Sequence, residues 1–346
     1  MRIEDMATDT HERVLRVTDE GSGLTGYIAI HSTTLGPAAG GLRMRVYGDE
    51  AAALEDVLRL SRGMTYKNAA ADLPLGGGKA VILGDPDAKT PAQLRAMGRA
   101  VESLAGLYWT AEDMGMAPGD MAELARETGY VAGLASGRHA SGDPSPVTAR
   151  GVFESLRVTA RHRFGSDDLS GLRIAVQGLG HVGRALAELL AGAGARLIVA
   201  DPRASEVDRA VADLSARSAA PDGILAVDAD ILAPCAVGAV LNADTVPALR
   251  VAAVCGAANN QLAGPEDADR LHRRGILYAP DYIANAGGIV NVATEILRID
   301  DAPAFVAEKL DALGRTLDRI LTRAAAARTS PHHLADAIVA ERIRAG

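Results

Sequence analysis

Hydrophobic and polar residues alternate along the first part of the chain, as they do in half-buried β-strands. The pattern predicts strands at residues 14–17, 26–30, 41–47 and 80–83. Between residues 49 and 67 the apolar spacing changes to three or four, which predicts a helix with Asp49 as its N-cap. Lys67 continues the apolar stripe of that helix, so it either serves a site or extends its ammonium group to solvent.

From residue 147 onward, apolar runs of strand length alternate with helical patterns. We expect helices at residues 147–163, 181–193 and 205–216, and strands at residues 172–177, 196–200, 231–233 and 251–254. This order is typical of a doubly wound parallel sheet. The tail is expected to be helical from about residue 302 to 344, with a break at residues 329–331.

A small, polar, Pro- and Gly-rich stretch at residues 136–146 separates the two patterns. We therefore expect an α/β protein of two domains with a cleft between them. The first, at residues 1–138, would be an α/β substrate and catalytic domain. The second, at residues 139–324, would be a Rossmann-type dinucleotide-binding domain.

Three glycines run directly into a lysine at residues 76–79. We expect the glycines to form a loop that turns sharply and admits a ligand, with Lys79 at the junction between this loop and the next strand. A lysine there can hold a phosphate or carboxylate, or act as a base with a lowered pKa. The alternative is an ordinary exposed lysine after a flexible turn.

Asp113 follows an apolar stretch that begins at residue 107 and is predicted to be a strand. The carboxyl ends of strands are where α/β sheets place their reactive groups. The alternative is an N-cap for the helix that begins near Pro118.

The second domain carries the sequence Gly178-Leu-Gly180-His-Val-Gly183 between a predicted strand and a predicted helix. In this context Gly178 makes a tight turn, Gly180 admits a pyrophosphate, and Gly183 allows close packing of helix and strand. Asp201 ends the next strand, about 20 residues later, where an acid binds the ribose 2′-hydroxyl and favours NAD over NADP. Arg203 leaves NADP open.

The composition excludes some classes of binding partner and indicates a compartment. The 346 residues carry a formal net charge of −8, which argues against a nucleic-acid or anionic-membrane partner. No uncharged apolar run approaches the roughly 18 residues of a membrane span, and no signal peptide is evident, so we expect a cytoplasmic protein. Cys235 and Cys255 lie in apolar stretches and are expected to be reduced and buried, and no metal site is expected.

A nicotinamide cofactor supplies hydride chemistry, so binding and proton transfer fall to the protein. Lys67, Lys79 and Asp113 all precede the dinucleotide-binding domain. Together they suit an anionic substrate that must lose a proton. One lysine can pair with a carboxylate, and the other can be neutral enough to act as a base.

Nine segments, in order along the chain, carry a family resemblance. They lie at residues 36–41, 62–68, 75–80, 110–115, 142–148, 178–183, 233–236, 256–261 and 280–288. The chain resembles the amino-acid dehydrogenase family that includes the glutamate, leucine, phenylalanine and valine enzymes. It looks closest to the leucine/phenylalanine/valine branch.

The resemblance implies reversible oxidative deamination of an L-amino acid to a 2-oxo acid and ammonia, with NAD as cofactor. It implies that Lys79 activates the attacking water, that Lys67 binds the α-carboxylate, and that Asp113 binds the amino group and shuttles protons. The other substrate-binding residues would be Ala39, Gly40, Met64, Asn259, Asn260, Ile289 and Val292. The cofactor-binding residues would be Thr148, Gly178, Leu179, Gly180, His181, Val182, Gly183, Arg184, Asp201, Pro202, Arg203, Cys235, Ala236, Ala257 and Ala258. The family also implies a homo-oligomer built through the first domain, with the C-terminal helix, at about residues 325–346, packed back on that domain.

Ala39 stands where the glutamate enzymes place a lysine and the leucine enzymes usually place a leucine. With Ile289 and Val292 as the other apolar walls, we expect an apolar substrate, phenylalanine or another aromatic residue ahead of leucine or valine. One alternative function is a dinucleotide sensor without turnover. Another is an NAD-dependent 2-hydroxy-acid dehydrogenase, which would need a His–carboxylate pair. His139 lies in the linker, and His181 is expected to face solvent.

Overall fold

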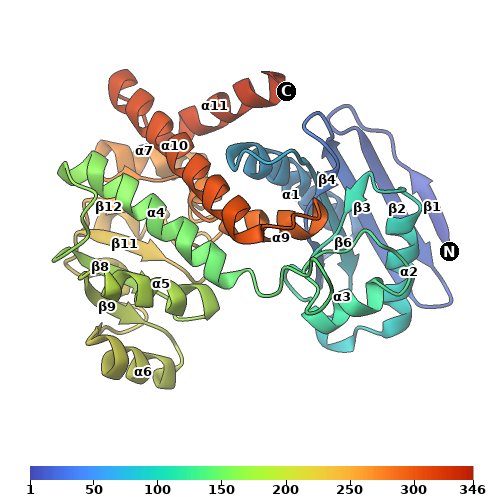
Figure 1. Ribbon diagram of the computed structural model, residues 1–346, viewed down its shortest axis with the longest axis horizontal. Helices are drawn as coiled ribbons and strands as arrows, with labels where there is room; N and C mark the ends of the chain where they lie inside the picture. Colours follow the sequence, from blue (N-terminus) through green and yellow to red (C-terminus); the bar gives the residue numbers. More distant parts are fainter. Residues whose placement is uncertain (346) are drawn as a thin grey trace. The chain divides into compact units, whose positions relative to one another are not determined.

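The computed structural model describes residues 1–345, and its contacts group into two units, each built on one β-sheet (Figure 1). Unit 1 comprises Met1–Pro144, Asn291–Phe305 and the chain from Arg342 onward. Unit 2 comprises Ser145–Val290 and Val306–Glu341. Within residues 1–345, no helix combines the length and apolar character needed to cross a bilayer.

These groups differ from the expected boundaries in three places. Unit 1 extends to Pro144 and not to residue 138. Asn291–Phe305 belongs to unit 1, although its sequence position suggested the second domain. The C-terminal helix α11 (Pro331–Ala345) is divided, and its first eleven residues belong to unit 2. Contacts within unit 2 hold them there, since Tyr282 donates a hydrogen bond to Asp336 (3.0 Å) and His333 lies 2.7 Å from Asp269.

The sheet of unit 1 is mixed. Its strands are β1 (Arg2–Asp5), β2 (Arg13–Asp19), β3 (Leu24–Ser32), β4 (Ala38–Ala39), β5 (Leu42–Arg45), β6 (Gly76–Leu83) and β7 (Tyr108–Trp109). The order is β1-β2-β3-β6-β4-β7, with β5 also paired to β6. The pairs β1–β2, β2–β3 and β3–β6 are antiparallel, whereas β4 and β5 run parallel to β6. Its helices are α1 (Glu50–Ala70), α2 (Pro91–Glu102), α3 (Pro118–Leu124) and the short η1 (Pro86–Ala88).

The expectation of a glycine loop before Lys79 is wrong. Gly76, Gly77 and Gly78 lie inside β6, and none of them has a positive φ. A Cβ on Gly77 would lie 2.1 Å from the backbone nitrogen of Thr65 on α1, and one on Gly78 would lie 2.6 Å from the Tyr108 ring. The absent side chains therefore allow close packing within unit 1, and Lys79 lies in mid-strand.

Helix α1 begins as predicted. The Asp49 carboxylate accepts a hydrogen bond from the Ala52 amide (2.8 Å), which is the N-cap interaction expected of this residue. The helix buries small residues such as Ala53 and Thr65. Lys67 is half-buried near its C-terminal end.

Unit 2 holds the parallel sheet that the second pattern predicts. Its strands are β8 (Arg173–Gln177), β9 (Arg196–Ala200), β10 (Arg217–Ser218), β11 (Ile231–Pro234), β12 (Ala253–Val254) and β13 (Leu277–Tyr278), in the order β10-β9-β8-β11-β12-β13. All neighbours pair parallel. The order reverses beside β8, which is the switch point of a doubly wound sheet.

Helices α4 (Ser145–Phe164) and α5 (His181–Gly192) lie beside this sheet, and further helices follow its strands along the chain (Figure 1). The further helices are α6 (Ala204–Leu214), α7 (Pro265–Arg273), α8 (Asp281–Ala284), α9 (Gly287–Ile296), α10 (Ala302–Ala327) and the short η2 (Ile224–Ala226) and η3 (Val246–Ala248). The predicted helix at 181–193 and the predicted break near residue 329 are confirmed. The unit boundary falls within α9, so Ile289 belongs to unit 2 and Val292 to unit 1.

Glu295 explains why the end of α9 belongs to unit 1. Its Oε2 accepts hydrogen bonds from the amides of Gly133 (2.7 Å), Leu134 (3.3 Å) and Ser141 (3.2 Å) and from the Ser141 hydroxyl (2.9 Å). One turn earlier, Asn291 donates to the Ser141 carbonyl (2.9 Å). A carboxylate that accepts several donors stabilises its loop strongly, so this contact fixes residues 133–141 to α9.

Candidate active site

Lys79 and Asp113 form a buried ion pair in unit 1. Lys79 is 6% exposed on β6, and its Nζ lies 2.5 Å from Oδ2 of Asp113. Asp113 does not cap α3, because the N-cap position is Ala117, whose amide donates to Asp120 (2.8 Å). Neither of the alternative roles, an exposed lysine or a capping aspartate, describes these two side chains.

A third charged residue, Arg43, completes this cluster and was not among the predicted site residues. Its Nε lies 3.3 Å from the same Oδ2 of Asp113, and its Nη1 donates to Asp56 (3.1 Å). Tyr47 donates to the same Asp56 oxygen (2.9 Å). The available signal was a charged residue between two buried apolar ones, Leu42 and Met44, in a predicted strand.

The charges decide the state of Asp113. Burial would raise its pKa, but the positive charges of Lys79 and Arg43 outweigh burial and hold the pKa at about 2. Asp113 is therefore a carboxylate at neutral pH. A buried anion between two cations can bind an ammonium group or take up a proton that a substrate releases.

Three other predicted substrate residues of unit 1, Ala39, Gly40 and Met64, lie beside β6. Ala39 is fully buried in β4, and the Gly40 carbonyl accepts a hydrogen bond from the Tyr108 hydroxyl (2.7 Å). A Cβ on Gly40 would lie 2.9 Å from Cγ of Met64, so these two residues are in contact. Val292, on α9, is 8% exposed.

The glycine fingerprint of unit 2 has the geometry that a dinucleotide requires. Gly178 has a φ of +93°, and a Cβ on Gly183 would lie 2.0 Å from the Gly178 carbonyl oxygen. A Cβ on Gly180 would meet nothing within 4 Å, so the space in front of it is open. Helix α5 begins at His181, and its N-terminus supplies amide groups for a pyrophosphate.

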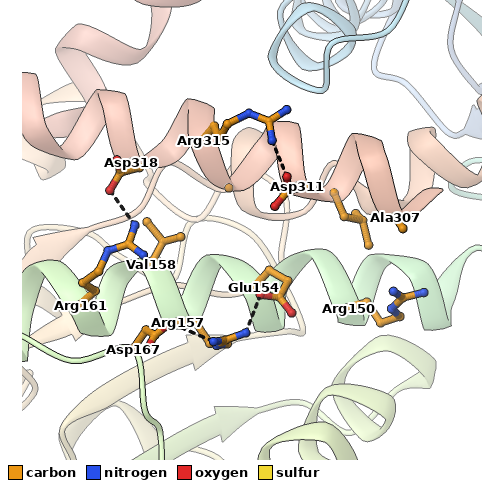
Figure 2. A pocket seen from close by; sticks show the side chains of 12 residues that line it. Arg150, Glu154, Arg157, Val158, Arg161, Asp167, Ala307, Asp311, Arg315 and Asp318 are labelled. Carbon is orange, nitrogen blue, oxygen red and sulfur yellow. Dashed lines mark hydrogen bonds and ion pairs between the residues drawn. The ribbon is translucent and has the colours of Figure 1, made fainter. Parts of the chain in front are cut away.

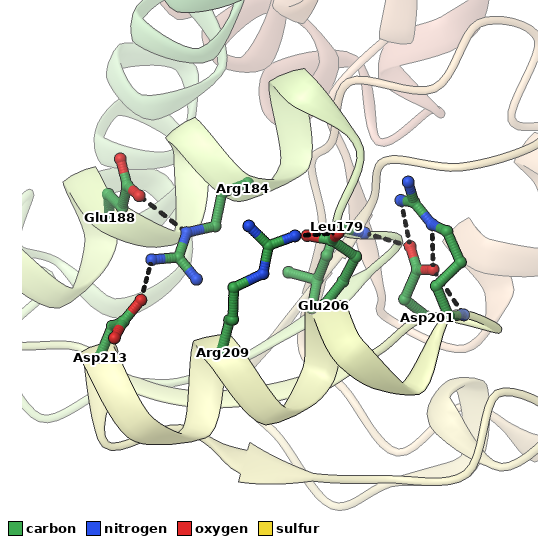
Figure 3. A network of polar contacts seen from close by, with 8 residues as sticks. Leu179, Arg184, Glu188, Asp201, Glu206, Arg209 and Asp213 are labelled. Carbon is green, nitrogen blue, oxygen red and sulfur yellow. Dashed lines mark hydrogen bonds and ion pairs between the residues drawn. The ribbon is translucent and has the colours of Figure 1, made fainter.

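Asp201 is joined to the fingerprint loop, as Figure 3 shows. Its Oδ2 accepts from the Leu179 amide (2.7 Å), and its Oδ1 accepts from the amide (2.9 Å) and the Nε (3.0 Å) of Arg203. The Arg203 guanidinium holds the pKa of Asp201 at about 2, against burial. Arg184, by contrast, has its guanidinium engaged by Glu188 (2.7 Å) and Asp213 (2.8 Å).

The remaining predicted cofactor residues follow the neighbouring strands of unit 2. Ala236 lies beside Gly178, whose Cβ would come within 2.7 Å of the Ala236 Cβ. Thr148 lies beside the start of α9, because a Cβ on Gly287 would come within 2.8 Å of the Thr148 Cα. Burial raises the pKa of the Cys235 thiol to about 12, so this residue contributes shape rather than charge. Pro202 and His181 are exposed, as are Asn259 and Asn260; Val182 and Ala257 are half-buried, and Ala258 and Ile289 are buried.

Asn285 is a second residue that sequence reasoning missed. It is 5% exposed and donates to the Ala257 carbonyl (3.1 Å) and to Oδ1 of Asn259 (2.8 Å). Its own Oδ1 is buried and has no hydrogen-bond partner within residues 1–345. Through these hydrogen bonds Asn285 lies among the predicted cofactor and substrate residues, beside Ala257 and Asn259.

A groove in unit 2 is separate from these residues. It is a cavity of about 610 Å³ between α4 and α10. Figure 2 shows the charged side chains that line it and the pairs they form. Arg157 contacts Asp167 (2.8 Å), and Arg161 contacts Asp318 (2.8 Å). None of the predicted site residues lines it. Within residues 1–345, no group of three or more His, Cys, Asp or Glu side chains is arranged for a metal ion.

Comparisons with known proteins identify the family. Two family models match: "Glu/Leu/Phe/Val dehydrogenase, dimerisation domain" at residues 11–130 and "Glutamate/Leucine/Phenylalanine/Valine dehydrogenase" at residues 200–330. The leucine dehydrogenase of Bacillus subtilis (strain 168) is 47% identical over 334 residues, covering 96% of this chain and 91% of that protein. This chain belongs to the Glu/Leu/Phe/Val dehydrogenase family.

Other members of the family are similarly related to the chain. The phenylalanine dehydrogenase of Lysinibacillus sphaericus is 49% identical over 297 residues, covering 83% of this chain and 77% of that protein. The crystal structure of the L-tryptophan dehydrogenase of Nostoc punctiforme superposes with a TM-score of 0.86 at 39% identity, covering 97% and 96% of the two chains. The chain is thus an amino-acid dehydrogenase, an oxidoreductase that acts on a CH–NH2 group.

A third family model, for the NAD-binding domain of D-isomer-specific 2-hydroxyacid dehydrogenases, matches residues 148–239. This range holds the fingerprint and Asp201 but none of unit 1. The match therefore supports dinucleotide binding and leaves the chemistry to the residues of unit 1, where Asp113 pairs with Lys79 and Arg43.

Proposed function

We propose that this chain catalyses the reversible, NAD-dependent oxidative deamination of an apolar L-amino acid to a 2-oxo acid and ammonia. The observation that carries the proposal is the buried Lys79–Asp113 pair in a chain of this family. It supplies an amine and a carboxylate at one point, which is what deamination needs for water activation and for binding the amino group.

The chain's residues have distinct parts in this proposal. Lys67 binds the substrate α-carboxylate, and the Asp113 carboxylate binds the amino group. The chemistry supplied by bound NAD is acceptance of a hydride from Cα, which leaves an imino acid. Lys79 then activates a water that attacks the imino carbon, and Asp113 moves protons to the nitrogen, so that ammonia leaves and the 2-oxo acid remains.

NAD is favoured over NADP by Asp201. Gly178, Gly180, Gly183 and the start of α5 would hold the pyrophosphate. A carboxylate that ends β9 would bind the ribose 2′-hydroxyl and repel a 2′-phosphate. The Arg203 guanidinium donates to Asp201 through Nε (3.0 Å) and Nη2 (3.2 Å), which leaves it less available to a phosphate.

The residues that the family resemblance assigns to the substrate side chain favour an apolar substrate. Ala39, Ile289 and Val292 carry no charge that would pair with a γ-carboxylate, and Ala39 takes little volume. We propose that an aromatic side chain such as that of phenylalanine is accepted ahead of leucine and valine, by the roughly 1–3 kcal/mol that pocket volume contributes. The named relatives act on leucine, phenylalanine and tryptophan, so all three belong in the test.

We also propose a cytoplasmic homo-oligomer that associates through residues 11–130, the range that matches a dimerisation domain. Light scattering of the purified protein would measure the subunit number, and a monomer at micromolar concentration would reject association.

The test of function is NAD reduction at 340 nm with a panel of L-amino acids, using Lys79→Ala as the blank. Turnover of apolar amino acids that falls by at least about a thousandfold in the variant is expected. Silence across the panel, with NAD still bound, would favour the non-catalytic sensor instead. Turnover of 2-hydroxy acids alone would favour the hydroxy-acid reaction.

A further inference from the structure

Arg43 has no part in the reaction as proposed, yet it contacts the same oxygen of Asp113 as Lys79 does. We propose that Arg43, held by Asp56 and Tyr47, is a positioning residue that fixes the orientation and the charge of the Asp113 carboxylate. This inference rests on the proposed function of Asp113.

The backbone places Arg43 against Asp113 from both sides. On β5, the Leu42 amide donates to the Ala111 carbonyl (2.7 Å), and the Met44 amide donates to the Met114 carbonyl (2.9 Å). These two hydrogen bonds flank Arg43 in one segment and Asp113 in the other. A Cβ on Gly41 would lie 2.8 Å from the Asp113 Cβ, so the two segments are already in close contact.

The far end of Arg43 is anchored on helix α1. Asp56 accepts from Arg43 Nη1 (3.1 Å) and from the Tyr47 hydroxyl (2.9 Å) through one oxygen, and from Arg59 (2.8 Å) through the other. The Arg43 and Asp56 side chains are 12% and 11% exposed. An arginine buried between two carboxylates cannot turn away from one without leaving a buried charge uncompensated.

This anchor matters because Lys79 must change its proton count if it activates water. Arginine keeps its charge throughout the accessible pH range, so Arg43 keeps a positive charge beside Asp113 when Lys79 is neutral. Asp113 then stays ionised, and the substrate nitrogen finds an acceptor at a fixed place. Without Arg43, burial would favour the protonated acid whenever Lys79 was neutral.

Two tyrosines are further titratable groups around Arg43, Asp56 and Asp113. Tyr108 lies behind Asp113, and both burial and the Asp113 charge raise its pKa, so it stays protonated. Near Asp56, burial together with the Asp56 charge raises the pKa of Tyr47. The Arg45 guanidinium lies over the Tyr47 ring, 5.0 Å from its centre. A cavity of about 220 Å³ borders Tyr47, Asp56 and Arg59. This cavity reaches Asp56, which binds the Arg43 guanidinium.

The experiment uses the full-length enzyme with three variants: Arg43→Ala, Arg43→Lys and Arg59→Ala. Arg59 contacts the same Asp56 from the surface, at 56% exposure, and serves as the matched control. The first readout is the NMR titration of the Asp113 ¹³Cγ, assigned by comparison with Asp113→Asn. The second is the pH profile of kcat, with and without added guanidinium chloride at constant ionic strength.

Arg43→Ala is expected to raise the pH midpoint of Asp113 by at least about one unit. It should also lower kcat at least about tenfold, with the KM for NAD unchanged, and guanidinium should restore part of the rate. Arg43→Lys should lie in between, and Arg59→Ala should match wild type. An Asp113 midpoint that does not move in Arg43→Ala would overturn the inference.

Asp56→Asn decides the matter if Arg43→Ala does not fold, because it keeps Arg43 but weakens its anchor. A smaller upward shift of the Asp113 midpoint supports the inference, and no shift overturns it. The NMR titration does not depend on turnover. A wild-type enzyme that deaminates no amino acid would therefore refute the proposed function while the titration still judged the Arg43–Asp113 contact.

Discussion

Gly77→Ala tests whether the glycines before Lys79 serve packing. The added Cβ would lie 2.1 Å from both the backbone nitrogen and Oγ1 of Thr65, and 2.5 Å from its Cα. Two of these three atoms are backbone, so no side-chain rotation relieves the contact and α1 must move away from β6. Overpacking of this kind costs about 1–3 kcal/mol of unfolding free energy, and backbone contacts place it at the upper end.

The assay is urea unfolding of unit 1, followed by the fluorescence of Trp109, the single tryptophan, and checked for an unchanged denaturant slope. Gly63→Ala is the control. Gly63 lies on α1, the helix that carries Thr65, and a Cβ there would meet nothing within 4 Å. That change should stabilise the protein by about 0.5–1 kcal/mol through helix propensity. Gly77→Ala with wild-type stability would refute the packing account and return these glycines to a role in admitting a ligand.

Three further predictions follow from named contacts. Because the folded pKa of Asp113 is lowered from 3.8 to about 2, its contribution is present above pH 4 and lost as the pH falls toward 2. The free energy of unfolding of the wild type should fall by about 2 kcal/mol more than that of Asp113→Asn between pH 5 and 2. An equal fall in both proteins would contradict this. Asp201→Ser should lower the preference for NAD over NADP about tenfold in kcat/KM; an unchanged ratio would mean that Asp201 does not face the ribose. Glu295→Ala should speed hydrogen exchange of the Gly133, Leu134 and Ser141 amides but not those of β8. Equal protection in both proteins would mean that Glu295 does not fix residues 133–141 to α9.

Much of unit 2 was predictable, because its helices and strands follow local periodicity. The strand, turn and helix around the fingerprint glycines were also predictable, since this context is local. Asp49 as a helix cap is another local signal, and it is confirmed.

What failed depended on partners far away in sequence. A glycine in the sequence is equally consistent with a loop and with a tightly packed strand. For Gly77 the contact with Thr65, twelve residues earlier, shows that it lies in a packed strand. The position of Arg43 between two apolar residues marked it as unusual, but its role could not be assigned without Asp56 and Asp113, which contact it from other elements. The division of α9 between units was equally hidden, because burial periodicity does not state which unit buries a residue.

The most direct test of the central claim is a product balance with one apolar L-amino acid and NAD. NADH is measured by absorbance, ammonia by an independent enzymatic assay, and the 2-oxo acid by chromatography. Equal amounts of all three, with Lys79→Ala binding NAD but forming none, are the predicted result. NADH formed without ammonia, or ammonia release that survives in Lys79→Ala, would contradict oxidative deamination at the Lys79–Asp113 pair.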